Sequence, residues 1–192
     1  GEADPNGVLP YFQAKHIGAM FRGDANSTTG FCVVTGITNN FTATVQVIQA
    51  FGGDFAALGG APIWYESIWS DLRGWPRSVA FFQGRAVYGG ADLDPTLLVF
   101  SELNDFSQLI DVAVTGDTYT ASIQPFKEFL QVPRQDPIQW VIPGRTLYIG
   151  TGSQEIIGSG ADPAAAIASD NKQFSIETAY ATEHVQTLRI SN

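Results

Sequence analysis

Two segments of this sequence share a hairpin pattern. Residues 80–89 read AFFQGRAVYG and residues 140–150 read WVIPGRTLYIG, and they align when their Gly-Arg pairs, which end at Arg85 and Arg145, are superposed. The interval is 60 residues (145 minus 85). Each copy is an apolar strand, a tight turn that ends in Gly-Arg, and a second strand in which an aliphatic residue precedes a tyrosine. The sequence therefore predicts two copies of one small β-unit.

Further strand-like segments follow each hairpin, so that each unit offers four short strands separated by turn residues. These predicted strands are residues 96–101, 119–124, 154–158 and 174–179. In the turn of the second hairpin, Pro143-Gly144 predicts a type II turn, because proline presets one φ and glycine supplies the positive φ.

Four strands per unit, repeated every 40–60 residues or so, is the pattern of β-propeller blades. A single four-stranded sheet cannot bury both of its faces, so blades stack on their neighbours around an axis. Two units are visible, and residues 185–190 resemble the start of a third. A closed propeller needs at least about four blades. The sequence therefore predicts an incomplete propeller, and we expect the chain, which lacks an initiator Met, to be an excerpt of a longer protein.

The residues before the repeat predict a separate, small β module. Residues 31–36 read as one strand and residues 35–40 as turn-rich, whereas residues 42–48 alternate, with Val45 and Val47 on one face. Glycines make residues 51–62 read as a loop. We place the division of the chain between residues 1–65, an N-terminal segment with this module, and residues 66–192, which hold the blades.

Helix signals are few. Residues 162–168 begin with Asp162 as a helix N-cap and Pro163 at the first helical position, which predicts one or two helical turns. Residues 11–21 offer a second short turn. The predicted fold class is therefore all-β: a small β module, blades of a partial β-propeller, and one or two short helices.

The charge balance disfavours a nucleic-acid-binding surface. The formal net charge is −9, with only 10 lysines and arginines and no two of them adjacent. Affinity for phosphates grows with clustered cations.

The single cysteine, Cys32, lies in an apolar run and predicts a buried thiol, since no disulfide can form within the chain. No apolar run reaches the length of about 20 residues that a membrane span requires.

Residues that carry chemistry do not form a recognisable motif. His16 and His184 are the two histidines, and Ser159 lies in a Gly-Ser-Gly loop signal that does not match a Gly-x-Ser-x-Gly elbow. Asp92 and Asp94 sit in a glycine-rich turn that lacks the further oxygen ligands of a calcium loop.

Cys32 and the two distant histidines do not have the ligand spacing of a zinc site. The Gly-Thr-Gly-Ser segment at residues 150–153 does not fit a dinucleotide-binding loop. We therefore predict no catalytic residue, no cofactor, no cofactor-binding residue and no metal ligand, and expect that the chain is not an enzyme. A propeller glycosidase stays as a remote alternative, because it requires carboxylates that converge on a pocket.

The tryptophans have two interpretations. Trp75 and Trp140 each precede a repeat hairpin, which favours packing in the core between blades. Trp64, Tyr65 and Trp69 are the first candidates for an exposed aromatic cluster, the feature expected of a receptor- or glycan-binding module.

Residues 69–107 resemble a known family. Residues 69–85 read WSDLRGWPRSVAFFQGR, and they are followed by Tyr-Gly-Gly at residues 88–90, Val-Phe-Ser at residues 99–101 and Asn-Asp-Phe at residues 104–106. This order is similar to that of the tail tubular protein B, or nozzle, family of short-tailed bacteriophages and of related tail-hub and DNA-stabilisation proteins.

The likeness extends over most of residues 15–181. Residues 138–160 are similar to the next blade of that family, and the segment with His16-Ile17-Gly18 and residues 31–47 is similar to the part that precedes the propeller. Residues 126–136 look like an added stretch before the second blade, and Ile156 stands where that family usually has an aromatic residue.

The resemblance implies a structural piece of a phage tail, a nozzle, tail tube or hub, that forms part of the wall of the DNA-exit channel. Its partners are other copies of itself in a ring and adaptor or portal-side tail proteins, and double-stranded DNA passes through without specific binding. It implies a virion protein without a membrane span, assembled in the cytoplasm of the bacterial host. A receptor- or glycan-binding tail module is the alternative.

Overall fold

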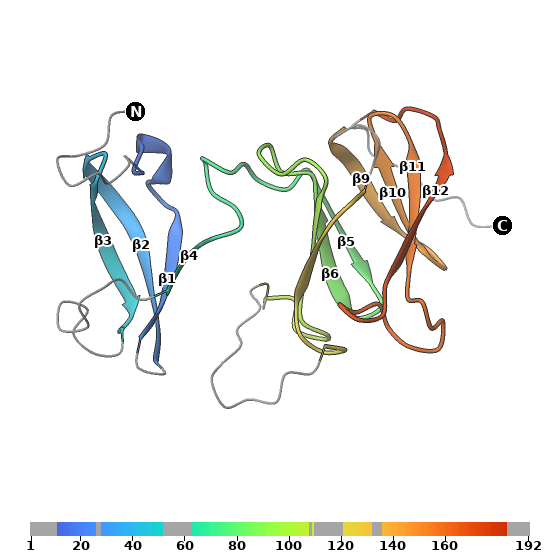
Figure 1. The fold of residues 1–192 in the computed structure, drawn as a ribbon, viewed down its shortest axis with the longest axis horizontal. Coiled ribbons are helices and arrows are strands. Elements are labelled where there is room, and N and C mark those ends of the chain that lie inside the picture. The colour runs from blue at the N-terminus through green and yellow to red at the C-terminus, as the bar shows by residue number, and fades with distance from the viewer. Residues whose placement is uncertain are drawn as a thin grey trace. The chain divides into compact units, whose positions relative to one another are not determined.

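A computed structural model of the chain describes residues 11–25, 28–51, 63–107, 109, 121–131 and 136–183. The described part of the chain holds three four-stranded antiparallel sheets and, as its one helical element, a short 3-10 turn, which confirms the all-β prediction (Figure 1). The chain divides into two compact units, Gly1–Gly74 (unit 1) and Trp75–Asn192 (unit 2), whereas the sequence placed the division after Tyr65. Residues beyond Tyr65 stay with unit 1 because the Ser67 N–H donates to the carbonyl of Met20 on β1 (2.8 Å) and Arg73 pairs with Glu66 (2.9 Å).

Unit 1 is one sheet with the strand order β3-β2-β1-β4. Its elements are η1 (Ala14–His16), β1 (Met20–Ala25), β2 (Thr28–Asn39), β3 (Thr42–Gln49) and β4 (Ile63–Glu66). Both predicted strands and the turn near the N-terminus are confirmed. However, β2 continues through the segment expected to be turn-rich, and the chain reverses only at Asn40 and Phe41, where Asn39 Oδ1 accepts a hydrogen bond from the Phe41 N–H (2.8 Å). The predicted loop at residues 51–62 lies almost entirely outside the described residues.

One face of this sheet carries the small core of unit 1. Val34 pairs with Val45 and Cys32 with Val47, so the two alternating valines share one face, as predicted, and it is the face that carries the core. Burial of Cys32, also predicted, is confirmed. The buried residues of this core are Ala19, Phe21, Cys32 and Val34, with Phe12, Ile37, Ala43 and Phe51 packed against them.

Unit 2 contains two meanders, in which each strand pairs with the next one along the chain. The first sheet consists of β5 (Ser78–Phe82), β6 (Arg85–Gly89), β7 (Leu97–Phe100) and β8 (Phe126–Phe129). The second consists of β9 (Ile138–Pro143), β10 (Leu147–Thr151), β11 (Glu155–Ser159) and β12 (Gln173–Thr178). The two Gly-Arg hairpins thus form the first two strands of two consecutive sheets.

The fourth strand of the first sheet lies where it was not expected. Residues 121–124 form a turn, and the strand is β8, inside the stretch that looked like an addition before the second blade. Phe126 explains this position, because its ring stacks on that of Phe100 on the neighbouring strand (centroids 4.3 Å apart). The third-unit prediction at residues 185–190 lies outside the described residues.

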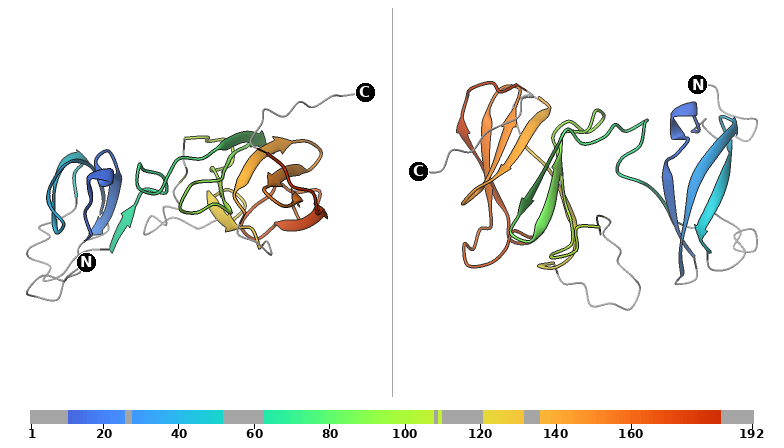
Figure 2. Two further views of the ribbon diagram at one scale, coloured as in Figure 1. Left: turned by 90° about the horizontal axis from the view of Figure 1, so that it is seen from above. Right: turned by 180° about the vertical axis from the view of Figure 1, so that it is seen from behind.

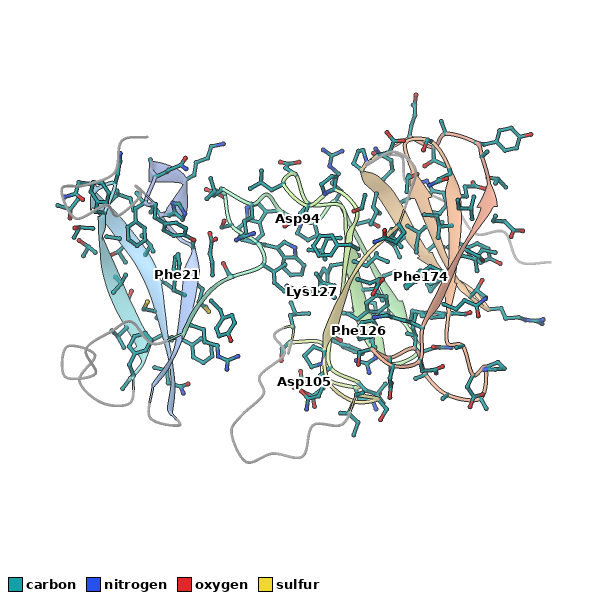
Figure 3. All side chains as sticks on the ribbon, viewed as in Figure 1. Phe21, Asp94, Asp105, Phe126, Lys127 and Phe174 are labelled. Carbon is teal, nitrogen blue, oxygen red and sulfur yellow. The ribbon has the colours of Figure 1, made fainter. Side chains whose placement is uncertain are left out.

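The two sheets of unit 2 lie against each other (Figure 2), and their facing side chains form one common core (Figure 3). Both β5 and β6 contact β9, and the Ile138 N–H donates to the carbonyl of Pro95 (2.9 Å). At the other side of the sheets, β8 and β12 line a groove of about 260 Å³. The first strands therefore lie in contact, and the fourth strands lie on either side of the groove. The core consists of Ala80, Phe82, Val87, Leu98, Phe100, Phe126, Leu130, Ile138, Val141, Leu147, Ile149, Ile156 and Ile167, with Phe174 packed against it.

The turns of the two hairpins differ in length. Gln83 and Gly84 form a two-residue turn with φ of 48° and 77°, the type I′ pattern that suits twisted hairpins. In the second hairpin Pro143 pairs with Leu147, so the loop has one residue more. The type II prediction for this turn is wrong, since Gly144 does not adopt a positive φ and Pro143 remains in the strand.

The prediction of one or two helical turns at residues 162–168 is also wrong. The Asp162 carboxylate accepts from the Ala164 N–H as expected (2.9 Å), but the turn that follows is not helical. The backbone of Ile167 explains why the segment is not helical. Its N–H donates to Gln83 Oε1 (2.8 Å) and its carbonyl accepts from Arg85 Nε (3.0 Å), so both groups are bound to the first sheet.

Candidate functional site

Arg85, the arginine of the first Gly-Arg turn, is fully buried. Burial lowers its pKa from the ordinary value and the charge of Glu102 acts in the opposite direction, but an arginine remains charged at neutral pH. The guanidinium satisfies its donors with backbone carbonyls, and so it fixes the turn at residues 121–124 and the loop before β12 to the hairpin. The accepting carbonyls belong to Ser101, Ser122, Ile123, Gln124 and Ile167.

The second arginine of the repeat is not buried. Arg145 is exposed in the longer loop between β9 and β10. The repeat therefore describes the backbone of the two hairpins and not a shared role for the two arginines.

The first sheet turns an apolar face away from the common core. Pairing places Val79 beside Tyr88 on this face, together with Phe81 and, on β8, Phe129. Val79 is 53% exposed, Phe81 61% and Phe129 44%. Phe106 lies edge-on against Phe81 with ring centroids 5.0 Å apart and extends the surface. We name this surface, Val79, Phe81, Tyr88, Phe106 and Phe129, the Phe81 face.

The second sheet also has an apolar outward face. Val141, Ile149 and Ile156 point into the common core, so the residues that alternate with them point outward. Tyr148 is 43% exposed, and the others are half-buried. A side chain at Gly150 would overlap the Trp140 ring, so that ring lies flat on this face. We name this surface, Trp140, Ile142, Tyr148 and Ile157, the Tyr148 face.

The backbone of the first sheet shows which face is which. Ala86 exchanges hydrogen bonds with Ser101 at the end of β7, through its carbonyl (2.9 Å) and its N–H (2.9 Å). Its neighbour Val87 therefore directs its N–H and C=O toward β5 and pairs with Ala80. Ala80 and Val87 belong to the common core. On β5, the residues hydrogen-bonded to the next strand are the inward ones.

The second sheet has the opposite arrangement. The Val141 N–H donates to Ser78 Oγ (2.8 Å), on the side of β9 away from β10. Its neighbours Trp140 and Ile142 therefore direct their N–H and C=O toward β10. On β9, the residues hydrogen-bonded to the next strand are the outward ones.

This difference fixes the relative orientation of the sheets. In an upward-running strand of L-residues, a side chain that faces the viewer has its N–H and C=O on the viewer's right. Each sheet can be viewed with its first strand (β5 or β9) running upward and its second strand (β6 or β10) on the right. In this view the first sheet shows its core face, whereas the second sheet shows its outward face. The two sheets therefore stack in like orientation, as two copies related by a rotation do. The faces that meet in the core are of opposite kinds, one shown by the first sheet in this view and one hidden by the second. The extra loop residue between β9 and β10 is consistent with this result, because a shift of one residue exchanges the faces of a strand.

Unit 1 contains an apolar pocket of about 690 Å³ above its core. Tyr11 and Glu66 are its polar residues, at the end near η1 and β4. Burial raises the pKa of the Cys32 thiol, and a backbone hydrogen bond at Phe21 acts in the opposite direction. The remaining lining residues are Phe12, Phe21, Cys32, Val34, Val45, Val47 and Phe51.

Glu66, whose side chain is buried, is the centre of a polar cluster beside this pocket. Its Oε2 accepts from Arg73 Nε (2.9 Å) and from the Tyr11 hydroxyl (3.1 Å), while its Oε1 lies 3.8 Å from His16 Nε2. His16 Nδ1 accepts from the Gln13 N–H (2.9 Å), which places the proton of a neutral ring on Nε2. Burial and then the charge of Glu66 raise the pKa of Tyr11. The cluster joins η1 to β4, and no sequence motif indicated it.

The other residues singled out from the sequence do not assemble with it in the described structure. Asp92 pairs with Arg77 (3.2 Å), Ser159 ends β11, and His184 lies outside the described residues. The described residues contain no group of three or more His, Cys, Asp or Glu that could hold a metal ion.

The aromatic residues singled out from the sequence differ in burial. Trp75 is 60% exposed, so its predicted place in the core is wrong, and Trp140 lies half-buried on the Tyr148 face. Tyr65 is exposed, with the Arg22 guanidinium 5.3 Å above its ring, and Trp69 is half-buried.

No protein-family model matches this sequence, and no curated protein matches it either. Within the described part of the chain, no helix has the length and apolar character needed to cross a membrane.

Proposed function

We propose that this chain is a structural component of a bacteriophage tail, a nozzle or hub piece whose unit 2 forms part of the wall of the DNA-exit channel. One observation carries the proposal: two consecutive four-stranded meanders stack in like orientation, with their first strands in contact and their fourth strands on either side of one groove. Blades of a β-propeller stack in this way. The resemblance of residues 69–107 and 138–160 to phage nozzle proteins supplies the biological setting.

The charges of the chain support a channel through which DNA slides. The net charge is −9, and several of the 10 basic residues are already engaged within the fold. Arg85 is buried against carbonyls, and Arg73, Arg77 and Lys172 each form an ion pair with a carboxylate. A surface with few available cations releases few counterions from DNA and so binds it weakly.

The two outward faces of unit 2 support a role in assembly. A monomeric soluble protein seldom exposes large apolar patches, and such patches usually mark contacts with other proteins. The proposal therefore includes copies of the same chain and adaptor or portal-side tail proteins as partners, a place in the virion tail, and assembly in the host cytoplasm. It assigns no catalytic step to the chain.

Electron microscopy of the virion tests this proposal. Gold-labelled antibodies against the chain are expected to bind the tail below the portal, and a density map of the tail is expected to contain the two stacked sheets in the channel wall. Label on the capsid or its absence from virions would overturn the proposal. Saturable binding of the purified chain to one glycan on an array would instead favour a receptor-binding module.

A further inference from the structure

We propose that the Phe81 face of one copy of this chain receives the Tyr148 face of a second copy, in a head-to-tail contact that repeats the contact between the two sheets of unit 2. The inference names the partner of the assembly surfaces described above and rests on the stacking that carries the proposed function. It specifies which face meets which, and it requires that neither face binds its own counterpart.

The orientation of the two sheets leads to this pairing. Inside unit 2, the core face of the first sheet meets the opposite kind of face on the second. The Tyr148 face of the second sheet has the same orientation as the core face of the first sheet. The Phe81 face has the same orientation as the face that the second sheet turns to the core. The Tyr148 face of one copy can therefore pack on the Phe81 face of another in the same orientation as the two faces that meet in the common core.

The chemistry of the faces agrees with this pairing. Each presents aromatic and aliphatic side chains, and both include a tyrosine at the corresponding place in the second strand, Tyr88 and Tyr148. Lys127 is the one charged strand residue on the side of the Phe81 face, and Glu155 lies on the side of the Tyr148 face. Opposite charges at the edges of two apolar surfaces favour their contact and disfavour contact between like faces.

A second copy is the partner that these observations favour. The described part of unit 2 holds two sheets of this kind, and its two outward faces complement each other. A contact between unlike faces is heterologous, so it continues from copy to copy and closes into a ring where the rotation permits. The contact also covers the surface around Val79 and Phe81, which is more than half exposed in the single chain.

Mixing two variants of the full 192-residue chain tests the pairing. Phe81→Asp blocks one face and Tyr148→Asp blocks the other, and Ile48→Asp places the same charge on an exposed apolar residue of unit 1 as a matched control. Analytical ultracentrifugation over a concentration series measures self-association, and circular dichroism verifies the fold of each variant. Phe129→Asp replaces Phe81→Asp if that variant does not fold.

The expected result has three parts. The wild-type chain and Ile48→Asp associate equally. Each face variant alone associates at least about 30-fold more weakly, because aromatic anchors dominate interface energies. An equimolar mixture of Phe81→Asp and Tyr148→Asp forms a dimer that grows no further, since one intact pair of unlike faces remains.

Three outcomes would overturn the inference: a monomeric wild-type chain at every concentration, a face variant that associates like the wild type, or a mixture that stays monomeric. These measurements use purified chain, whereas the tail-labelling test uses virions. Failure of the pairing with label on the tail would leave the tail role standing, and pairing without label would leave the contact standing.

Discussion

Arg85 Nε donates a hydrogen bond to the carbonyl of Ile167, 82 positions later in the chain, at 3.0 Å. The bond joins the first hairpin of the first sheet to the loop before the last strand of the second sheet. Because the same guanidinium also binds carbonyls of the turn at residues 121–124, one side chain ties three distant segments together.

Replacement of Arg85 by Met is expected to destabilise unit 2 strongly. The variant leaves several buried carbonyls without donors, which costs about 3 kcal/mol or more of the free energy of unfolding. Urea unfolding followed by circular dichroism measures this loss. Arg145→Met removes the exposed arginine of the repeat and is expected to change the free energy by less than about 0.5 kcal/mol. Equal effects of the two variants would show that the buried network does not stabilise the unit.

Gly90→Ala tests the close approach of the two sheets. Gly90 has φ of +80°, and a Cβ there would overlap the carbonyl oxygen of Ile138 at the start of β9. Gly18 in unit 1 has φ of +89° and open space around it, so Gly18→Ala measures the backbone strain alone. We expect a loss of about 1 kcal/mol for Gly18→Ala and of about 3 kcal/mol for Gly90→Ala, which adds overpacking to strain. Thermal and urea unfolding compare the two variants, and a Gly90→Ala loss no larger than the control would contradict the close contact.

Tyr11 and Glu66 predict a dependence of stability on high pH. Burial first and Glu66 second raise the pKa of Tyr11 above its ordinary value of 10.0. The unfolded chain therefore ionises this tyrosine first, so the contribution of Tyr11 to stability is complete below pH 10 and falls as the pH rises further. Glu66→Gln removes the charge and is expected to bring the pKa of Tyr11 closer to the ordinary value.

Ultraviolet titration measures the ionisation of Tyr11 as the difference between the wild-type chain and Tyr11→Phe. Repeating the difference in the Glu66→Gln background isolates the effect of the carboxylate. An unchanged Tyr11 titration in that background would exclude the charge of Glu66 as a cause and leave burial alone.

The ion pair between Lys172 Nζ and Glu128 Oε2 (2.7 Å) bridges the two sheets of unit 2 beside their groove. Both side chains keep about a quarter of their surface in solvent. We expect a coupling energy of only about 0.5 kcal/mol, which decreases with added salt. A double-mutant cycle with Lys172→Met and Glu128→Gln at low and high salt measures it. A coupling that is large and independent of salt would contradict this estimate.

Local patterns explain why much of the fold was predictable. The strands β3, β7, β11 and β12 and both hairpins were located from runs of β-branched and aromatic residues between glycines and prolines, because these preferences act over a few neighbouring residues. Burial of Cys32 followed from its apolar run. The register-dependent details failed at positions where a neighbour in space competes with local preference.

Three such positions show the limit. Residues 162–168 carry every local signal of a helix start, yet Gln83 and Arg85 take the hydrogen-bonding groups of Ile167. The β8 strand forms where Phe126 can stack on Phe100, not where the local pattern was strongest. The cluster of Glu66, Arg73, Tyr11 and His16 joins segments some 50 residues apart and carries no signature in any one of them.

The sequence alone thus determined that this chain is built from short strands in repeated hairpins, since alternation, β-branching and turn residues act within each segment. Only the tertiary structure decided which side of each strand is buried, which of the two repeat arginines binds the backbone, and that the two sheets stack with unlike faces in contact. Those choices depend on one-residue differences in loop length and on hydrogen bonds between distant segments. Such contacts stabilise the fold only when the sheets are packed together, so no single segment of the sequence indicates them.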